Sequence, residues 1–416
     1  MGLDFISAFH TNGFHAMIKR IIRAVVFVLA VGAASFAQAS PDPLISSVEN
    51  GLRPPVVFEG DAPWSLKQRM EHYGVPAASV AVIKDSEISW HKVYGLADRD
   101  TNEPAGSDTL FQAASISKSL TSFSALQMVE AGQLGLDDDV NQVLQSWTLP
   151  DNPAAQGTTV TLRQLLSHTG GITVAGFVGY PPGLPVPNLV QVLDGSGPAN
   201  SDPIRIDKLP GGDYRYSGGG YTIVQQMMID VSGMAFPDLM RQQTLGQINM
   251  HHSSFEQPLP PNSLQLAAAG VWPSGRSVPG KRHTYPELAA AGLWTTAADL
   301  ALFAIEVQKA LRGDSQLMSQ EVARMMIEPV DHDYALGLGI RIVGKFTYFG
   351  HRGWNEGFSS ELLASPKDGY GVVVMINSNH PDFISEVIRG VGFTYGWAGY
   401  EVQQKSDIPQ ALLENS

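Results

Sequence analysis

The sequence predicts an α+β fold, in which an antiparallel sheet is flanked by helices and carries an inserted, mostly helical domain. Apolar residues recur with the period of strands near both ends of the chain and with the period of helices in the middle. The strand-like runs follow one another across short turns, which is typical of antiparallel pairing. We therefore expect residues 64–110 and 331–400 to form one sheet domain and residues 111–330 to form a helical domain.

The sheet domain is expected to begin with a helix and a β-hairpin. Residues 64–73 have a helical pattern that ends at Gly74-Val75-Pro76. Residues 79–84 and 88–95 have strand-like composition and are separated by the turn Asp85-Ser86-Glu87. These features predict two neighbouring antiparallel strands.

The helical domain is expected to begin with a helix from Ser115 to Gly132, where apolar residues recur every three positions before the glycine. A capping-box pattern at residues 161–164 opens a short second helix. Residues 172–210 are rich in Pro and Gly and have little periodicity, so they predict a long surface excursion that can line a cleft. Further helices are expected at residues 222–231, at residues 234–245 and within residues 289–311, the last capped by Thr295 or Thr296.

Beyond residue 333 the pattern returns to that of strands. Four consecutive antiparallel strands are expected at residues 334–343, 345–349, 358–365 and 370–378, and a closing helix at residues 383–391. His351 follows the second of these strands. Taken alone, it is expected to be a histidine at the end of a hairpin.

Composition excludes several classes of function. The chain has 416 residues, a net charge of −13 and a pI near 5.2, which argues against a nucleic-acid partner or an anionic membrane surface. It contains no cysteine, so disulfides, thiol catalysis and zinc–thiolate sites are excluded. The acidic run at residues 137–139 is expected to be a solvated turn at a helix start. We expect no cofactor and no metal.

The N-terminus has the pattern of a secretory signal. Lys19, Arg20 and Arg23 precede an apolar run at residues 24–34, and Ala37-Gln38-Ala39 provides a small-residue cleavage site. We expect a signal peptide at residues 1–39 and a secreted or periplasmic protein. An uncleaved anchor is the alternative, and no later segment has the length of a membrane span. A linker at residues 40–63 and a C-terminal tail at residues 401–416 complete the expected organisation.

The stretch from Ser115 to Lys118 pairs a hydroxyl with an amine three residues later. On a helix these side chains share one face. At the start of a helix, Ser115 also lies among unpaired N–H groups, where a developing oxyanion is stabilised. The alternative is that Ser115 caps the helix and Lys118 is solvated. A second match, Ser89-Trp90-His91-Lys92, lies in a predicted strand, where residues three apart point to opposite faces.

Two further residues have both a structural and a chemical interpretation. Tyr216 lies in the glycine-rich segment 211–221, which allows close approach of a ligand but also suits a packing tyrosine in a turn. His168 precedes Thr169-Gly170 and is expected to be a structural histidine in a tight turn.

Taken together, three motifs in order resemble those of the penicillin-recognising serine hydrolases. They are Ser115-Ile116-Ser117-Lys118, Tyr216-Ser217-Gly218 and His351-Arg352-Gly353. The nearest branch contains class C β-lactamases, D,D-peptidases, D-aminopeptidases and related esterases. The resemblance covers residues 65–397 and implies a β-lactamase/transpeptidase-like fold. His168-Thr169-Gly170 also fits the third motif, but it follows no strand and comes in the wrong order.

The resemblance also implies roles for individual residues. Ser115 would attack a carbonyl and carry the acyl group, and Lys118 would help to deprotonate it. Tyr216 would relay the proton to the leaving group, aided by the positive charges of Lys118 and a protonated His351. The N–H groups of Ser115 and Trp354 would form the oxyanion hole. Gly218 and Gly353 would line the substrate-binding site.

Departures from the family's motifs favour an esterase or a D-peptidase. Gly218 stands where the second motif usually has the asparagine that holds the acyl side chain, and the Lys-Thr-Gly motif common in β-lactamases is absent. Trp354 is expected to narrow the cleft. The expected partner is therefore a small ester, amide or peptide substrate.

Two alternatives stay open at this point. One is a β-lactamase or D,D-carboxypeptidase acting on β-lactams or peptidoglycan peptides. The other is a non-catalytic penicillin-binding or cell-envelope sensor protein. A metal hydrolase and an α/β-hydrolase are disfavoured because neither His-Glu-x-x-His nor Gly-x-Ser-x-Gly occurs.

Overall fold

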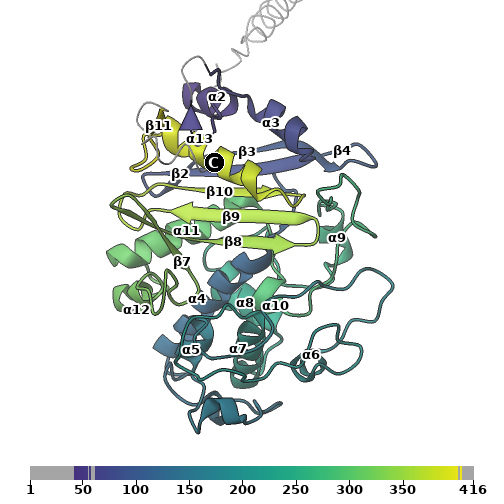
Figure 1. The fold of residues 1–416 in the computed structure, drawn as a ribbon, viewed down its shortest axis with the longest axis vertical. Coiled ribbons are helices and arrows are strands. Elements are labelled where there is room, and N and C mark those ends of the chain that lie inside the picture. Colours follow the sequence, from purple (N-terminus) through teal and green to yellow (C-terminus); the bar gives the residue numbers. More distant parts are fainter. Residues whose placement is uncertain (1–41, 55, 58–60, 402, 405–416) are drawn as a thin grey trace, which may run out of the picture. The chain divides into compact units, whose positions relative to one another are not determined.

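The computed structural model describes residues 42–54, 56–57, 61–401 and 403–404. Its centre is a seven-stranded antiparallel sheet in the order β4-β3-β2-β10-β9-β8-β7 (Figure 1). Strands from both ends of the sequence meet in the middle of this sheet, where β2 pairs with β10. The predicted α+β fold with an antiparallel sheet is therefore confirmed. The strands are β2 (Ala77–Lys84), β3 (Glu87–Asp98), β4 (Glu103–Pro104), β7 (Gly339–Val343), β8 (Phe346–Asn355), β9 (Phe358–Ala364) and β10 (Gly371–Ile376).

Helices cover both faces of the central strands, which explains their nearly continuous apolar sequence. Ala78, Val80 and Val82 of β2 belong to a core with α2 (Pro43–Asn50), α3 (Leu66–Tyr73) and α13 (Pro381–Thr394). The alternate residues, such as Ala81 and Ile83, face the larger core that includes α4 (Ser117–Glu130) and α11 (Ala297–Arg312). Figure 1 shows α2, α3 and α13 on one side of the sheet and α4 and α11 on the other.

The segment between the two halves of the sheet is mostly helical, in short pieces. Two begin with the side-chain caps that the sequence indicated: Thr161 and Gln164 form the expected capping box, and Thr296 caps α11. Among these helices, α7 and α10 contact α4, which lies between α7 and the sheet (Figure 1). The remaining helices here are α5 (Leu162–Leu166), α6 (Leu189–Asp194), α7 (Gly218–Ser232), α8 (Phe236–Met240), α9 (Pro261–Leu264), α10 (Leu288–Ala291) and α12 (Gln320–Met325).

Two expectations about local structure are wrong. Residues 172–210 are not only a surface excursion: they contain α6, opened by a capping box at Asn188, and Val192 and Ile204 are fully buried. His351 is not at the end of a hairpin but inside β8, which continues to Asn355 before turning at Gly357 with φ 78°. Pairing with β9 extends the strand through two glycines whose low strand propensity masked it in the sequence.

Several expectations concern the ends of the chain. The expected signal peptide at residues 1–39 lies outside the described residues, as does most of the expected tail at 401–416. The expected linker contains α2 and β1 (Val56–Val57), which pairs in parallel with β11 (Gln403–Gln404). In the part of the chain that the structure describes, no helix combines the length and apolar character needed to cross a bilayer.

Candidate active site

A tightly held turn brings Ser115 to the surface of the core. It lies in a short 3₁₀ helix, η1 (Ala114–Ile116), directly before α4. Ala114 has φ 50°, a left-handed conformation that is strained for a residue with a Cβ. Hydrogen bonds hold the turn on both sides: Ser117 Oγ donates to Ala114 O at 2.6 Å, and Ser360 Oγ donates to Ala113 O at 2.9 Å. Ser115 therefore has a defined position and remains partly exposed, although its neighbours are buried.

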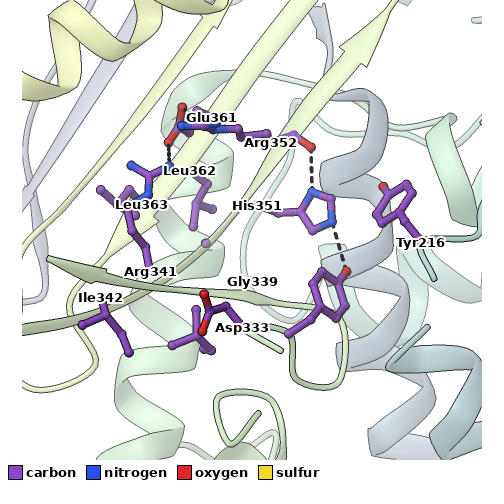
Figure 2. A pocket seen from close by; sticks show the side chains of 13 residues that line it. Tyr216, Asp333, Gly339, Arg341, Ile342, His351, Arg352, Glu361, Leu362 and Leu363 are labelled. Atoms are coloured by element: carbon purple, nitrogen blue, oxygen red, sulfur yellow. Dashed lines mark hydrogen bonds and ion pairs between the residues drawn. The ribbon is translucent and has the colours of Figure 1, made fainter. Parts of the chain in front are cut away.

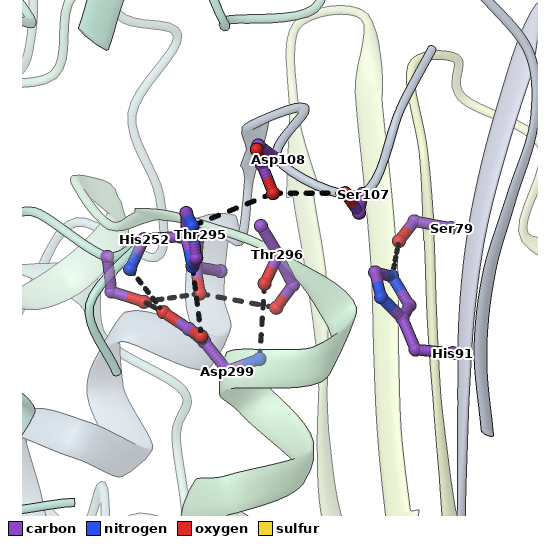
Figure 3. A network of polar contacts seen from close by, with 9 residues as sticks. Ser79, His91, Ser107, Asp108, His252, Thr295, Thr296 and Asp299 are labelled. Carbon is purple, nitrogen blue, oxygen red and sulfur yellow. Dashed lines mark hydrogen bonds and ion pairs between the residues drawn. The ribbon is translucent and has the colours of Figure 1, made fainter. Parts of the chain in front are cut away.

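A polar network holds the short strand that pairs with the segment leading into this turn (Figure 3). The short strand β5 (Phe111–Gln112) leads into the turn and pairs with β6 (Trp294–Thr295). Asp299 fixes β6 indirectly, since its carboxylate accepts hydrogen bonds from Ser253 Oγ at 2.7 Å and from the His252 backbone N–H at 2.9 Å. Ser253 Oγ also lies 2.7 Å from Thr295 Oγ1.

Lys118 is buried next to Ser115. Its Nζ lies 3.1 Å from Ser115 Oγ and donates to Ala290 O at 2.7 Å. The side chain is only 2% exposed. Burial lowers the pKa of Lys118 to about 7, because the charged amine has lost its water. The alternative that Lys118 is solvated is therefore wrong, and so is the cap: Ser115 forms no side-chain cap on α4, whose N-cap is Ile116.

Tyr216 completes the group around the amine. Lys118 Nζ lies 4.9 Å from the centre of the Tyr216 ring. Burial raises the pKa of Tyr216, and a hydrogen bond with Ser115 only partly offsets the rise. His168 packs against Tyr216 with ring centres 4.3 Å apart, and its Nδ1 accepts a hydrogen bond from Ser217 N at 3.0 Å. His168 is thus a buried neighbour that fixes the backbone next to Tyr216.

His351 lies beside Tyr216 but is neutral (Figure 2). Its Nδ1 is 2.6 Å from Arg352 O, a carbonyl that can only accept, so this nitrogen carries the proton. Its Nε2 then accepts from Tyr334 OH at 3.0 Å. Burial, and next the charge of Lys118, lower the pKa of His351 to about 3. The expectation that a protonated His351 supplies positive charge to Tyr216 is therefore wrong.

The end of β8 lies along the nucleophile turn. The pairing of β8 with β7 stops at Gly350, which leaves the following residues paired only with β9. A Cβ at Gly353 would lie 2.1 Å from Ala113 O, so only glycine allows the strand to approach the turn so closely. Gly353 is buried there and is not among the residues that line the cavity at Ser115, whereas Trp354 is, with 52% of its surface exposed.

Two cavities flank the group. A cavity of about 220 Å³ reaches Ser115 and Lys118, and its wall includes Phe177, Ala290 and Trp354. A second cavity of about 410 Å³ lies on the side of Tyr216 and His351 (Figure 2). Arg341 and Arg352 in its wall share the carboxylate of Glu361.

The structure brings Ser115, Lys118, Tyr216, His351 and Trp354 together, although the sequence spreads them over 240 positions. The expectation that Gly218 and Gly353 line the surface of the site is wrong. Both residues are buried beneath neighbouring backbone or side chains. Sequence reasoning missed several contributors, because no spacing pattern links them to the motifs. They are Phe177, Ala290 and Tyr334. His168, expected to be a structural histidine in a tight turn, is buried with φ 61° and accepts a hydrogen bond from Ser217 N.

Comparisons with known proteins agree with this arrangement. A family model described as Beta-lactamase matches residues 65–390. Penicillin-binding protein 4 of Amycolatopsis lactamdurans is 29% identical over 340 residues, which are 75% of this chain and 82% of that protein. Protein flp of Staphylococcus aureus (strain N315) is 25% identical over 313 residues, which are 73% of this chain and 60% of that protein. This chain thus spans about 60% of the length of that relative.

Solved structures share the fold. The octameric penicillin-binding protein homologue from Pyrococcus abyssi has a TM-score of 0.67 and 23% identity, over 81% of this chain and 77% of that one. SurE with D-Leu has a TM-score of 0.63 and 23% identity, over 81% of this chain and 75% of that one. The resemblance inferred from the three motifs is confirmed. Because the family match extends over most of its length, the chain belongs to the Beta-lactamase family.

Proposed function

We propose that the protein forms an acyl-enzyme on Ser115 and hydrolyses a small ester or amide, as an esterase or a D-peptidase does. One observation carries this proposal: Lys118 Nζ lies 3.1 Å from Ser115 Oγ in surroundings that lower its pKa to about 7. A substantial fraction of the amine is then unprotonated at neutral pH and can accept the hydroxyl proton.

The proposed acylation follows from these positions. Ser115 Oγ attacks the carbonyl carbon as its proton passes to Lys118 Nζ, and the carbonyl oxygen becomes an oxyanion. The N–H groups of Ser115, at the start of a helix, and of Trp354, on the free edge of β8, stabilise that charge. Tyr216 then donates its phenolic proton to the leaving group and recovers a proton from Lys118. Its raised pKa favours this role, since a phenol keeps the proton it must give.

The second half of the cycle returns the enzyme to its starting state. A water molecule attacks the carbonyl carbon of the acyl group on Ser115, and a proton of that water passes to Lys118. The acid leaves, and Ser115 Oγ regains its proton. His351 serves as a neutral neighbour of Tyr216. The imidazole ring of His351, held by Tyr334 and by Arg352 O, limits the space for the leaving group.

The first test is the mass of the protein, quenched in acid seconds after mixing with p-nitrophenyl acetate. We expect an added acetyl group on the peptide that contains Ser115. Ser89→Ala, which removes the exposed serine of the other Ser-x-x-Lys match, should acquire the same adduct. Release of nitrophenol with no adduct in any quench, or an adduct on another residue, argues against the acyl-enzyme at Ser115.

The same measurement addresses location. The leader-like residues 1–39 support export of this hydrolase to the periplasm or beyond. In protein recovered after export, the intact mass should correspond to a chain that begins at Ser40. A chain that still carries residues 1–39 contradicts cleavage after Ala39.

The pH profile tests the charge of Lys118. We expect kcat/KM to rise with pH through about 7, because Lys118 must lose its proton to act as a base. His351→Gln should keep this rising limb at the same pH, since His351 is already neutral above pH about 3. A limb that disappears in His351→Gln assigns the titration to the histidine and contradicts the role given to Lys118.

A further inference from the structure

The loop of residues 173–178 is bound to the start of α7, which carries Gly218. Val174 in this loop has φ 63°, which is a rare conformation for a β-branched residue. Such strain persists only where surrounding contacts impose it. Those contacts are three successive hydrogen bonds: Ser217 Oγ to Thr173 O at 2.8 Å, Gly219 N to Val174 O at 2.9 Å and Gly218 N to Ala175 O at 3.0 Å.

The ring of Phe177 occupies the space in front of Gly218. A Cβ at position 218 would lie 2.9 Å from Phe177 Cε2 and 3.1 Å from Ala175 O. Side-chain atoms do not approach backbone oxygens and packed rings so closely without displacement. An asparagine therefore does not fit at position 218, and an aromatic ring takes the place of the amide that this motif usually provides.

The ring of Phe177, in place of an amide, makes one side of the cavity at Ser115 apolar. Phe177 and Val178 form one side of the cavity, and Ala290 and Ala291 lie nearby in its wall. Tyr216, the proposed proton donor to the leaving group, lines the larger cavity and not the small one. An acyl group bound in the small cavity would face Phe177.

The donor group of Asn355 in the wall of the small cavity already has partners. Asn355 Nδ2 donates to Gln112 Oε1 at 2.8 Å and to Ala291 O at 3.2 Å. Lys118 is engaged with Ser115 and Ala290 O. An amide in the acyl chain would lose water against the side chains of Phe177 and Val178, which offer no hydrogen bond, and this is costly.

We propose that Phe177 makes the acyl side of this site a pocket for apolar acyl groups, so that the enzyme prefers alkanoyl esters over esters whose acyl chain carries an amide. The proposal rests on the proposed acyl-enzyme at Ser115. It names a substrate class that the three motifs do not specify.

The test compares two esters with the same leaving group and acyl chains of the same length. These are p-nitrophenyl pentanoate and p-nitrophenyl N-acetylglycinate, each corrected for spontaneous hydrolysis. We expect kcat/KM to favour the pentanoate by about ten-fold or more, the effect of an unpartnered amide. p-Nitrophenyl acetate, which has the shortest acyl chain of the three, measures the chemistry with the least contact to the loop.

Variants assign the preference to the loop. Phe177→Ala should bring the ratio of the two kcat/KM values toward one while changing acetate hydrolysis much less. Phe177→Leu, which stays apolar, should keep the preference. Val178→Asn offers the amide of the substrate a hydrogen-bond partner, so it should also bring the ratio of the two kcat/KM values toward one. Val178 is 54% exposed, so we expect the variant to fold. Phe393→Ala, on α13 and 43% exposed, is the matched control and should leave the ratio unchanged.

Each outcome has one meaning. A wild-type ratio near one, or in favour of the N-acetylglycinate, overturns the proposal while acetate turnover upholds the proposed function. A preference that persists in Phe177→Ala also overturns it. If Phe177→Ala does not fold, an unchanged ratio in Val178→Asn has the same force. No hydrolysis of any of the three esters overturns the proposed function itself.

Discussion

Replacing Ser115 by alanine is expected to reduce kcat toward an activated ester by about 10⁴-fold or more, the range seen when a nucleophile is removed from a serine hydrolase. The reason is that no acyl-enzyme can form without Oγ, so only binding and the oxyanion hole would remain. The measurement is the rate of nitrophenol release from p-nitrophenyl acetate, with thermal unfolding measured beside it.

The folded state should hardly change in this variant. Lys118 keeps its hydrogen bond to Ala290 O, and the turn is held by Ser117 and Ser360 rather than by Ser115. We expect the free energy of unfolding to stay within about 1 kcal/mol of wild type. Ser89→Ala should match wild type in both measurements. An active Ser115→Ala enzyme would show that Ser115 is not the nucleophile. It would favour a non-catalytic role for Ser115 and Lys118.

Replacing Lys118 by methionine is expected to lower kcat/KM by about 10²- to 10⁴-fold, the usual contribution of a general base. Methionine has a similar length and no basic nitrogen, so the packing is largely retained. The rising limb near pH 7 should disappear together with the activity. Lys84→Met, at the exposed end of β2, is the control and should keep both.

The same variant makes a prediction about stability whose sign depends on the pKa of Lys118. Folding lowers that pKa from 10.5 to about 7, so between these values the unfolded chain binds more protons. Wild-type stability from this residue therefore rises with pH across that window and is weakest at and below about pH 7. The stability of Lys118→Met relative to wild type should accordingly fall as pH is raised from about 7 to about 10.

Urea unfolding at pH 7 and at pH 9.5 measures this difference. Lys84→Met, the same substitution at an exposed position, is the control for the loss of a lysine. A difference between Lys118→Met and wild type that does not depend on pH would mean that Lys118 stays protonated in the folded protein. It could not then act as the base.

Much of the fold followed from local patterns in the sequence. The hairpin of β2 and β3 was predicted because apolar and β-branched runs flank a short turn, and α11 because Thr296 precedes an amphipathic run. Strand β8 was predicted too short, since Gly350 and Gly353 have low strand propensity and only pairing with β9 extends it. Helix α6 was missed inside a segment rich in proline and glycine, although Asn188 and Gln191 provide a capping box.

The sequence by itself determined the pairing of Ser115 with Lys118, because a helix brings residues three apart to one face whatever surrounds it. It also determined the order of the three motifs, and hence the family. Only the tertiary structure decided the charge of the groups and the character of the pocket. Lys118 is buried and donates to the carbonyl of Ala290, 172 positions away. Phe177, from another segment of the chain, packs against Gly218. Burial and close contact depend on which distant segments meet, and no local spacing encodes that meeting.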